Sequence, residues 1–573
     1  MVVKNKLLIM NLYVNSIKNE RNVVEMRIII DKIEKNIDKP TKIVDLFDNK
    51  NYVYYAAKVN NRLRELDYVV SKDSEIKLLD LKDADVCRMY QATLRYVILM
   101  AIKEVLPKAR VIFNYSISRS IFVNVSNLGH PLFQDDFNLI KNKVNELVTK
   151  DMPIKRYSIS KEEAVKYYQA CGLTDKTKIL KYRKEDTVHM YECDGYKNYM
   201  FGYMLPSTGY LKKFELKLYA PGFLVRYPRS ENNGEIPLFS DERVFRDTLK
   251  EANHWADISR SNSIANINEI VESGKALEFI NLCEARHNRQ LAELGDKIEK
   301  NINNIKLICV AGPSSSGKTT FTNRLRIELK SRGINPLMIS IDNFYADPEL
   351  APKDEFGNPD FEHIDALDRK AFNDCMFRLI QGEEVRLPIY DFKTRSRTYE
   401  PPVKLKHNQP ILIEGIHALN NDLTPSIAIE YKFKIYIAPL AQCRIDDHNP
   451  ISISDIRLVR RMVRDYNFRG TGCEGTLKMW NSVRNGEFKW IYPFQNDADF
   501  VFNSELSYEL CVMKKYAIPL LEQIDSDSPY FITANRLLKF LKYFETITDK
   551  WVPCNSILRE FIGESIFYTE DKK

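Results

Sequence analysis

Hydrophobic and polar residues follow patterns that change from one region of the chain to the next. Up to residue 80, short β-branched runs such as residues 52–59 alternate with polar turns, which predicts a small β-rich module. Residues 86–105 space their apolar positions as a helix does, and Pro107 marks the end of that helix. Aromatic-rich strand candidates follow, so the stretch 83–228 is predicted to mix helices and strands.

The pattern changes twice more downstream of residue 240. Residues 240–300 contain no proline and space their apolar side chains helically, which predicts a helical connector. From residue 305 onward, short apolar runs alternate with helical patterns, as they do in βαβ units, and this predicts a parallel sheet with helices on both faces. The predicted strands are residues 305–310, 337–341, 411–413 and 433–437.

The composition narrows the class of protein. A chain of 573 residues is long enough for three or four domains, and its 44% hydrophobic and 28% charged residues exclude a disordered or fibrous protein. The formal net charge of +7 permits a polyanionic partner without requiring one. The 10 cysteines form no CxxC pair, which argues against a disulfide framework or a zinc ribbon. No apolar run approaches the roughly 18 residues of a membrane span, so we expect a cytoplasmic protein with no membrane association.

A phosphate-binding motif begins directly after the first strand of the predicted parallel sheet. Residues 312–319 spell GPSSSGKT, which satisfies the GxxxxGK[ST] pattern, and the strand before it and the helix-forming run after it argue against a chance Gly/Ser turn. Backbone N–H groups of such a loop surround phosphate oxygens, and the following helix directs its positive end at them. We expect Lys318 to neutralise the β- and γ-phosphates and the Thr319 hydroxyl to bind Mg²⁺. The residues predicted to bind the nucleotide are Gly312, Pro313, Ser314, Ser315, Ser316, Gly317, Lys318, Thr319 and Thr320.

Two carboxylates follow two of the other predicted strands. Asp342 comes after the strand at 337–341, and Glu414 follows the strand at 411–413. Ligands of an open α/β sheet lie at the carboxyl ends of its strands, where Asp342 would accept a proton from an attacking hydroxyl or hold Mg²⁺ through water, and Glu414 would bind Mg²⁺. Taken singly, each carboxylate is equally well explained by a turn or a helix cap. Their occurrence with the loop in one βαβ series favours a phosphoryl-transfer site.

A group of arginines shares one face of a predicted helix. Arg457, Arg460, Arg461 and Arg464 fall within an arc of about 100°, opposite an apolar face. A solvated basic face explains this pattern. In a phosphoryl-transfer enzyme, the same pattern is typical of a cationic lid that stabilises charge on the transferring group.

Taken together, these residues resemble the uridine kinase/phosphoribulokinase family of P-loop kinases. The resemblance is carried by residues 312–320, 340–345 (SIDNFY), 360–363 (DFEH), 366–368 (ALD), 387–394 (LPIYDFKT), 413–415 (IEG) and 457–465. The chain is more similar still to long bacterial-type nucleoside kinases in which this kinase follows a threonyl-tRNA-synthetase-like half. Three stretches are typical of that subgroup: 414–420 (EGIHALN), 446–449 (DDHN) and 559–563 (REFIG). The family implies ATP- or GTP-dependent phosphorylation, with Mg²⁺, of the 5′-hydroxyl of uridine or cytidine.

The resemblance also implies roles for single residues. Asp342 would be the general base, Thr319 and Glu414 would lie near the metal with it, and Lys318 would act on the phosphates. The catalytic lid arginines would be Arg457, Arg460 and Arg464. The residues placed near the nucleoside are Tyr345, His363, Tyr390, Phe392 and Arg395. Arg395 stands where uridine kinases have a base-contacting histidine, and a guanidinium cannot both donate and accept hydrogen bonds as a neutral imidazole does, which leaves the nucleobase open.

The N-terminal half resembles two pieces of threonyl-tRNA synthetases. Residues 41–46, 57–60 and 74–78 are similar to a TGS domain, which is a ubiquitin-like β-grasp module, and residues 83–228 are similar to the second additional domain. In that register, the zinc-ligand positions of the family hold residues that cannot bind zinc as imidazole or thiolate does. They are Ala92, Tyr96, Met200 and Met204. The resemblance therefore implies a scaffold, an RNA-contact surface or a sensor rather than a metal-dependent hydrolase of mischarged tRNA.

The sequence thus predicts a multidomain protein of α/β and α+β class. Its parts are a TGS-like β-grasp module (1–80), an α+β synthetase-like domain (83–230), a helical connector (231–300), a P-loop nucleoside kinase (301–510) and a C-terminal helical extension (511–573). The leading hypothesis is a nucleoside kinase. The alternatives are a P-loop kinase for another small hydroxyl metabolite and an RNA-binding regulatory protein whose loop acts as a switch. RNA or tRNA contact by the N-terminal half, and a homo-oligomer, remain open.

Overall fold

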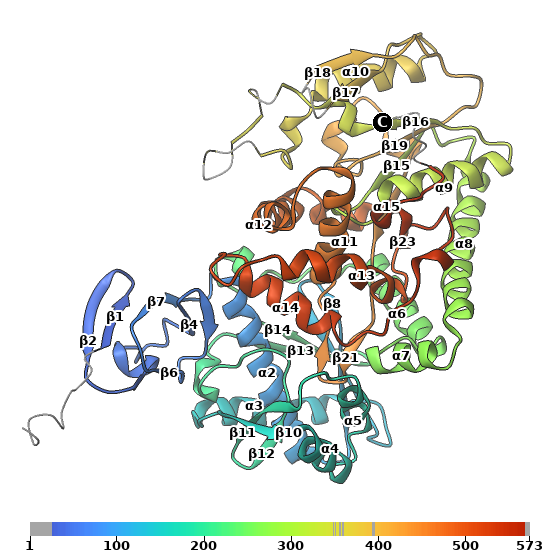
Figure 1. Cartoon of the computed structure of the whole chain (residues 1–573). Coiled ribbons are helices and arrows are strands. Elements are labelled where there is room, and N and C mark those ends of the chain that lie inside the picture. The colour runs from blue at the N-terminus through green and yellow to red at the C-terminus, as the bar shows by residue number, and fades with distance from the viewer. Residues whose placement is uncertain are drawn as a thin grey trace, which may run out of the picture.

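The computed structural model describes residues 26–347, 349, 351–353, 357, 360–391 and 396–567. Figure 1 shows a β-rich module at one side, a mixed α and β region next to it, and a larger α/β half beyond. The order of elements confirms the predicted fold class, with strand-rich, mixed, helical and parallel α/β regions following one another along the chain. Within the described ranges, no helix is long and apolar enough to cross a membrane.

The β-rich module is a mixed five-stranded sheet in the order β2-β1-β7-β4-β5. Strand β1 pairs in parallel with β7, and the other neighbours are antiparallel. Alternate residues of β1 are buried, as a sheet with one covered face requires. The elements of this module are β1 (Met26–Ile30), β2 (Ile33–Ile37), β3 (Thr41–Lys42), η1 (Ile43–Leu46), β4 (Ala56–Val59), β5 (Arg62–Arg64), β6 (Val69–Val70) and β7 (Ser74–Leu79).

The mixed region is organised around one long buried helix, α2 (Ala84–Val105). The Asp83 carboxylate caps this helix by accepting a hydrogen bond from the Asp85 N–H at 2.8 Å, and the helix ends before Pro107, as its pattern predicts. Two sheets accompany α2, in the orders β13-β14-β9-β8 and β10-β11-β12. The other elements are β8 (Arg110–Ile117), β9 (Ser120–Ser126), α3 (Gln134–Thr149), β10 (Lys155–Ser160), α4 (Lys161–Ala170), α5 (Thr174–Lys181), β11 (Thr187–Cys193), β12 (Tyr196–Asn198), β13 (Glu215–Tyr219) and β14 (Gly222–Arg226).

Three helices lead into the α/β half: α6 (Arg243–Ile258), α7 (Ile264–Glu272) and α8 (Ala276–Asn301). The helices expected here are present. Helix α8 also packs against the α/β half. It runs beside α9 (Figure 1), where the Arg324 guanidinium donates a hydrogen bond to the Asn288 side chain at 2.8 Å. Helix α8 is therefore one wall of the α/β half.

The α/β half contains the predicted parallel sheet, in the order β16-β19-β15-β20-β23. Its strands are β15 (Leu307–Ala311), β16 (Leu337–Ser340), β19 (Ile411–Glu414), β20 (Lys432–Ala438) and β23 (Phe500–Asn503). Alternate residues of β15 enter two hydrophobic clusters: Ile308 packs in the cluster that holds Phe321 of α9, and Cys309 in the cluster that holds Phe372 of α10. Both faces of the sheet are therefore covered, which explains why its strands are apolar throughout rather than alternating.

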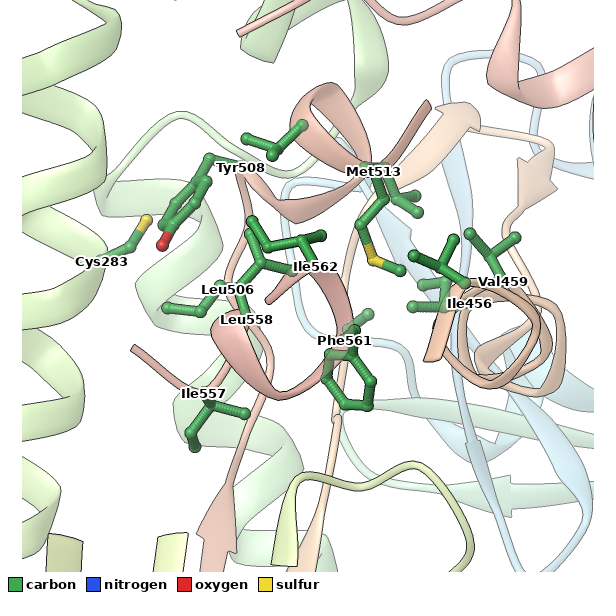
Figure 2. Close-up of a cluster of buried hydrophobic side chains, with 14 of the residues drawn as sticks. Cys283, Ile456, Val459, Leu506, Tyr508, Met513, Ile557, Leu558, Phe561 and Ile562 are labelled. Atoms are coloured by element: carbon green, nitrogen blue, oxygen red, sulfur yellow. The ribbon is translucent and has the colours of Figure 1, made fainter. Parts of the chain in front are cut away.

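Helices and two short hairpins complete this half. The helices are α9 (Lys318–Ser331), α10 (Arg369–Ile380), α11 (Ile453–Phe468), α12 (Cys473–Trp490), α13 (Glu509–Glu522), α14 (Phe531–Leu541) and α15 (Arg559–Ile562). The hairpins pair β17 (Pro388–Asp391) with β18 (Ser396–Tyr399), and β21 (Arg444–Asp446) with β22 (Asn449–Pro450). Figure 2 shows the core where α8, α11, α13 and α15 meet, with Cys283 and Phe561 among its side chains.

The β21–β22 hairpin joins the α/β half to the mixed region. The Lys176 ammonium of α5 forms a buried ion pair with the Asp446 carboxylate at 2.9 Å, and the Asn198 amide contacts the His448 ring at 3.0 Å. The Asp447 carboxylate accepts a hydrogen bond from Arg110 at 2.8 Å. The buried charges of the hairpin therefore have partners of opposite charge in the mixed region, and the two regions share an interface at this point.

Candidate active site

The phosphate-binding loop joins β15 to α9, and its backbone requires two glycines. A Cβ on Gly312 would lie 2.0 Å from the Ile437 carbonyl oxygen of β20, so no larger residue fits there. Gly317 has a φ of +89°, in the left-handed region that favours glycine. These two glycines therefore allow the loop conformation in which the N-terminus of α9 points toward a bound phosphate.

Lys318 lies at the first turn of α9 and folds back over the loop. Its ammonium donates hydrogen bonds to the carbonyl oxygens of Gly312 and Pro313, at 3.0 and 3.3 Å. Burial lowers the pKa of Lys318, and the carboxylates of Glu414 and Asp342 oppose that effect. A partly desolvated ammonium in the loop is suited to bind phosphate oxygens, which would replace the two carbonyls as its partners.

Asp342 and Glu414 lie at the carboxyl edge of the sheet, beside the loop. Glu414 is the last residue of β19, in register with Ser340 of β16 and Val310 of β15, and Asp342 follows β16 in a 3₁₀ turn, Ile341–Phe344. The Ser340 hydroxyl donates a hydrogen bond to the Glu414 carboxylate at 2.9 Å. Parallel pairing of these strands is thus what brings the two carboxylates to one place.

The charges at this edge act on one another. Burial, with the Asp342 charge added to it, raises the pKa of Glu414 to about 7. Burial likewise raises the pKa of Asp342, against the opposing charges of Lys318, Arg469 and Arg464. A carboxylate whose pKa is raised is a better proton acceptor, and two desolvated carboxylates near one another are best stabilised by a cation.

The oxygen donors at this edge suit Mg²⁺. Magnesium prefers oxygen ligands and is usually held by one or two carboxylates together with substrate phosphates and water. Glu414, Asp342 and the Thr319 hydroxyl supply that kind of donor set beside the loop. In the part of the chain that the structure describes, no three His, Cys, Asp or Glu side chains gather into a ready-made metal site. The donors therefore fit an ion that shares its coordination with the phosphates of a bound nucleotide.

The arginines of α11 lie inside the protein, under the loop. Arg457 is paired with Glu487 and Arg460 with Glu509, and both arginines are almost completely buried. Their guanidinium groups also donate to loop carbonyls: Arg457 to Ser314 at 2.9 Å and Arg460 to Ser315 at 3.4 Å. These two residues thus hold the loop backbone, and the solvated face that the helical pattern permits is absent here.

Two further arginines of this region lie closer to the carboxylates. Arg464 is paired with Asp465 at 2.6 Å, and its charge acts on Lys318 and Asp342. Arg469, which follows α11, acts on Asp342 as well. The lid role stays a prediction, and Arg464 is the member of the predicted set whose charge reaches the site.

The predicted acceptor side is lined by aromatic residues. The rings of Tyr345 and Tyr390 lie 6.1 Å apart, and the Tyr345 hydroxyl donates to the Phe361 carbonyl at 3.1 Å. The His363 ring lies 4.3 Å from that of Trp490, and its Nδ1 accepts a hydrogen bond from the Asp365 N–H, which caps a short turn. The predicted residues Phe392 and Arg395 lie outside the described residues.

The structure also describes two further residues of the quoted DFEH and EGIHALN stretches. Glu362 lies near Lys318 and Asp342, and burial together with the Glu487 charge raises its pKa to about 7. His417 is buried beside Trp490, and burial lowers its pKa to about 3, so its ring is neutral. Glu362 belongs to the quoted DFEH stretch, where its carboxylate next to His363 is the signal that could have identified it.

Comparison with known proteins places this site in context. The model of the phosphoribulokinase/uridine kinase family matches residues 307–508. A uridine kinase of Borrelia duttonii (strain Ly) is 30% identical over 201 residues, which are 34% of this chain and 85% of that protein. A possible uridine kinase from Bacillus stearothermophilus, of known structure, is 20% identical and covers 37% of this chain and 100% of its own, with a TM-score of 0.25.

The N-terminal part has a different relative. It is similar to a threonine–tRNA ligase of Laribacter hongkongensis (strain HLHK9), 27% identical over 162 residues. These are 28% of this chain and 25% of that ligase, so the match covers one part of a longer protein. The resemblance of this half to the synthetases is thereby confirmed.

Proposed function

The chain belongs to the phosphoribulokinase/uridine kinase family, and we propose that it is a nucleoside kinase acting on the 5′-hydroxyl of uridine, cytidine or a related nucleoside. It is a phosphotransferase with an alcohol group as acceptor. The observation that carries the proposal is the gathering of Lys318, Asp342 and Glu414 at one edge of the sheet, next to the phosphate-binding loop.

In the proposed reaction, ATP or GTP binds with its phosphates against the loop, 312–320. The Asp342 carboxylate accepts the proton of the nucleoside hydroxyl as its oxygen attacks the γ-phosphorus and the bond to the bridging oxygen of the β-phosphate breaks. Lys318 moves from the loop carbonyls to the phosphates, and Arg464 stabilises charge on the transferring group. Mg²⁺, when bound near Glu414 and Thr319, would neutralise charge on the β- and γ-phosphates.

A second candidate keeps the chemistry and changes the acceptor. Arg395 replaces the histidine that uridine kinases use at the base, which favours an acceptor that presents an anion or several hydrogen-bond acceptors to a guanidinium. A phosphosugar or a pantothenate-like hydroxy acid has such groups. Contact of the N-terminal half with RNA or tRNA is a separate proposal, supported by its synthetase-like sequence.

A substrate screen tests the proposal. Purified protein is incubated with ATP labelled at the γ-phosphate, Mg²⁺ and a panel of nucleosides, phosphosugars and hydroxy acids, beside the Lys318→Ala variant. We expect a labelled nucleoside 5′-monophosphate from the wild type and none from the variant. Labelling of a non-nucleoside alone would select the second candidate, and the absence of any transfer would contradict both.

A further inference from the structure

A segment far along the chain crosses the phosphate-binding loop. The Ile557 side chain packs on Gly317 so closely that a Cβ there would lie 2.4 Å from its Cγ2 atom. Three residues later, the Glu560 carboxylate accepts a hydrogen bond from the Thr320 N–H at 3.0 Å. Residues 557–560 are therefore part of the loop's surroundings, although the motif of the loop ends at residue 320.

The Thr320 N–H is one of the donors that a phosphate-binding loop offers to its ligand. The first N–H groups of α9 have no partner within the helix and point toward the loop, where they attract anions. Glu560 places an anionic oxygen on one of these donors. Its charge also acts on Lys318 and Glu414, two of the charged groups of the site. A carboxylate thus lies where negative phosphate oxygens are expected to bind.

The residues on either side of Glu560 are packed in the core, whereas the Glu560 side chain is partly exposed. Ile557, Leu558, Phe561 and Ile562 are all buried, and Figure 2 shows them packed among side chains of α8, α11 and α13. The Asn467 amide also donates a hydrogen bond to the Phe561 carbonyl at 3.0 Å. Glu560 itself is only half-buried, and its hydrogen bond to Thr320 is one that rotation of the side chain can break.

We propose that the Glu560 carboxylate competes with the nucleotide for the Thr320 N–H, and that nucleotide binding turns this side chain away while the segment around it stays packed. This inference depends on the proposed function in one respect: a nucleotide must bind the phosphate-binding loop. Its consequence is that Glu560 weakens nucleotide binding, because one negative charge must be displaced from the start of α9 before the phosphates reach it.

A purely structural role predicts something different. If Glu560 only caps α9, removal of its charge leaves nucleotide affinity unchanged as long as a hydrogen-bond acceptor remains. Glu560→Gln keeps an amide oxygen as acceptor and removes the charge, whereas Glu560→Ala removes both. The two variants therefore separate competition from capping.

The test is a titration of each purified full-length variant with a fluorescent ADP analogue. We expect both Glu560→Gln and Glu560→Ala to bind the analogue about 3- to 10-fold more tightly than the wild type, the scale of one charge at a helix start. Glu564→Gln is the matched control, because it removes the same charge from the same segment at an exposed side chain, and its affinity should equal that of the wild type. Thermal melting without nucleotide checks that each variant is folded.

Three results would contradict the proposal. Equal affinity of Glu560→Gln and the wild type, with binding lost in Lys318→Ala, would make Glu560 a cap alone and would leave the proposed function intact. Equal tightening by Glu564→Gln would assign the effect to net charge. Failure of the wild type itself to bind the analogue would contradict the nucleotide site and with it the proposed function.

Discussion

Two groups of residues in this chain differ in chemical character. One is the set of charged residues at the edge of the kinase sheet, and the other is the set of apolar residues at the positions that the synthetase resemblance assigns to zinc. At the edge of the kinase sheet, Lys318 and the carboxylates of Asp342 and Glu414 are kept close together despite the cost of burying them. In the N-terminal half, the positions that the synthetase resemblance assigns to zinc are part of a hydrophobic cluster. They are Ala92, Tyr96, Met200 and Met204, and none is more than 2% exposed.

The difference lies in what each group of side chains contributes to the protein. Apolar side chains at a buried position stabilise the surrounding fold. Buried charges at a working site bring no such gain, and they persist where a ligand uses them. The contrast predicts that substitutions in the kinase site lower activity without unfolding the protein. Substitutions in the apolar cluster of the N-terminal half should lower stability without changing activity.

The largest expected effect is at Asp342. Asp342→Asn should lower kcat by about 10²- to 10⁴-fold, because it removes the proton acceptor, and should leave nucleotide affinity largely intact. Steady-state kinetics and nucleotide titration measure the two quantities, with Asp374→Asn as a control at an exposed carboxylate of α10. Near-normal turnover of Asp342→Asn would remove the general base from the proposed reaction.

The next largest effect is a loss of stability from a substitution in the apolar cluster of the N-terminal half. Met204→Ala should destabilise the protein by about 2–5 kcal/mol, because the side chain is completely buried and its removal leaves a cavity. Urea unfolding followed by circular dichroism measures this loss, and kcat should be unchanged well below the unfolding transition. A tenfold fall in kcat without loss of stability would show that this half takes part in the reaction.

The smallest effect is on the pH profile. Since burial raises the pKa of Glu414 to about 7, the site should lose its ionised carboxylate as the pH falls, and kcat/KM should be about tenfold lower at pH 6 than at pH 8. Acid unfolding caused by Glu414 would not explain this fall in kcat/KM at low pH. A carboxyl group whose pKa is raised in the folded state binds more protons there and makes folding relatively more favourable as the pH falls.

Kinetics at constant ionic strength between pH 5.5 and 8.5 give this profile, with circular dichroism at each pH to check the fold. A flat profile between pH 6 and 8 would contradict the assignment of Glu414 to the reaction. It would also weaken the contrast between the two groups of residues, because the charge of Glu414 would then have no measurable role in the reaction.

Local sequence patterns were sufficient to predict much of this structure. The apolar runs that predict β15, β16, β19 and β20 are short, bounded and placed around one motif, and each became a strand of the parallel sheet. Because carboxyl ends of parallel strands meet at one edge, the sequence also placed Asp342 and Glu414 beside the loop. These inferences needed only spacing and strand direction.

Contacts between distant residues could not be predicted in this way. The helical pattern of Arg457 and Arg460 is the same for a solvated face and a buried one, and their partners Glu487 and Glu509 lie 30 and 49 residues further on. Glu560, 240 residues beyond Thr320, has no local signal of its contact, although its REFIG stretch belongs to the quoted subgroup pattern. Local sequence describes which side chains are available, and the tertiary fold decides which of them meet.

The distance along the chain between Thr320 and Glu560 also has a consequence during synthesis. A ribosome that has just completed the loop must add 240 residues before its last neighbour exists, which takes roughly 10 to 50 s at about 5–20 residues per second. Until then, Gly317 and the start of α9 lack the packing that Ile557 provides. A nascent chain would therefore expose an unfinished nucleotide site while these 240 residues are added, and the competing carboxylate would arrive only at the end of that interval.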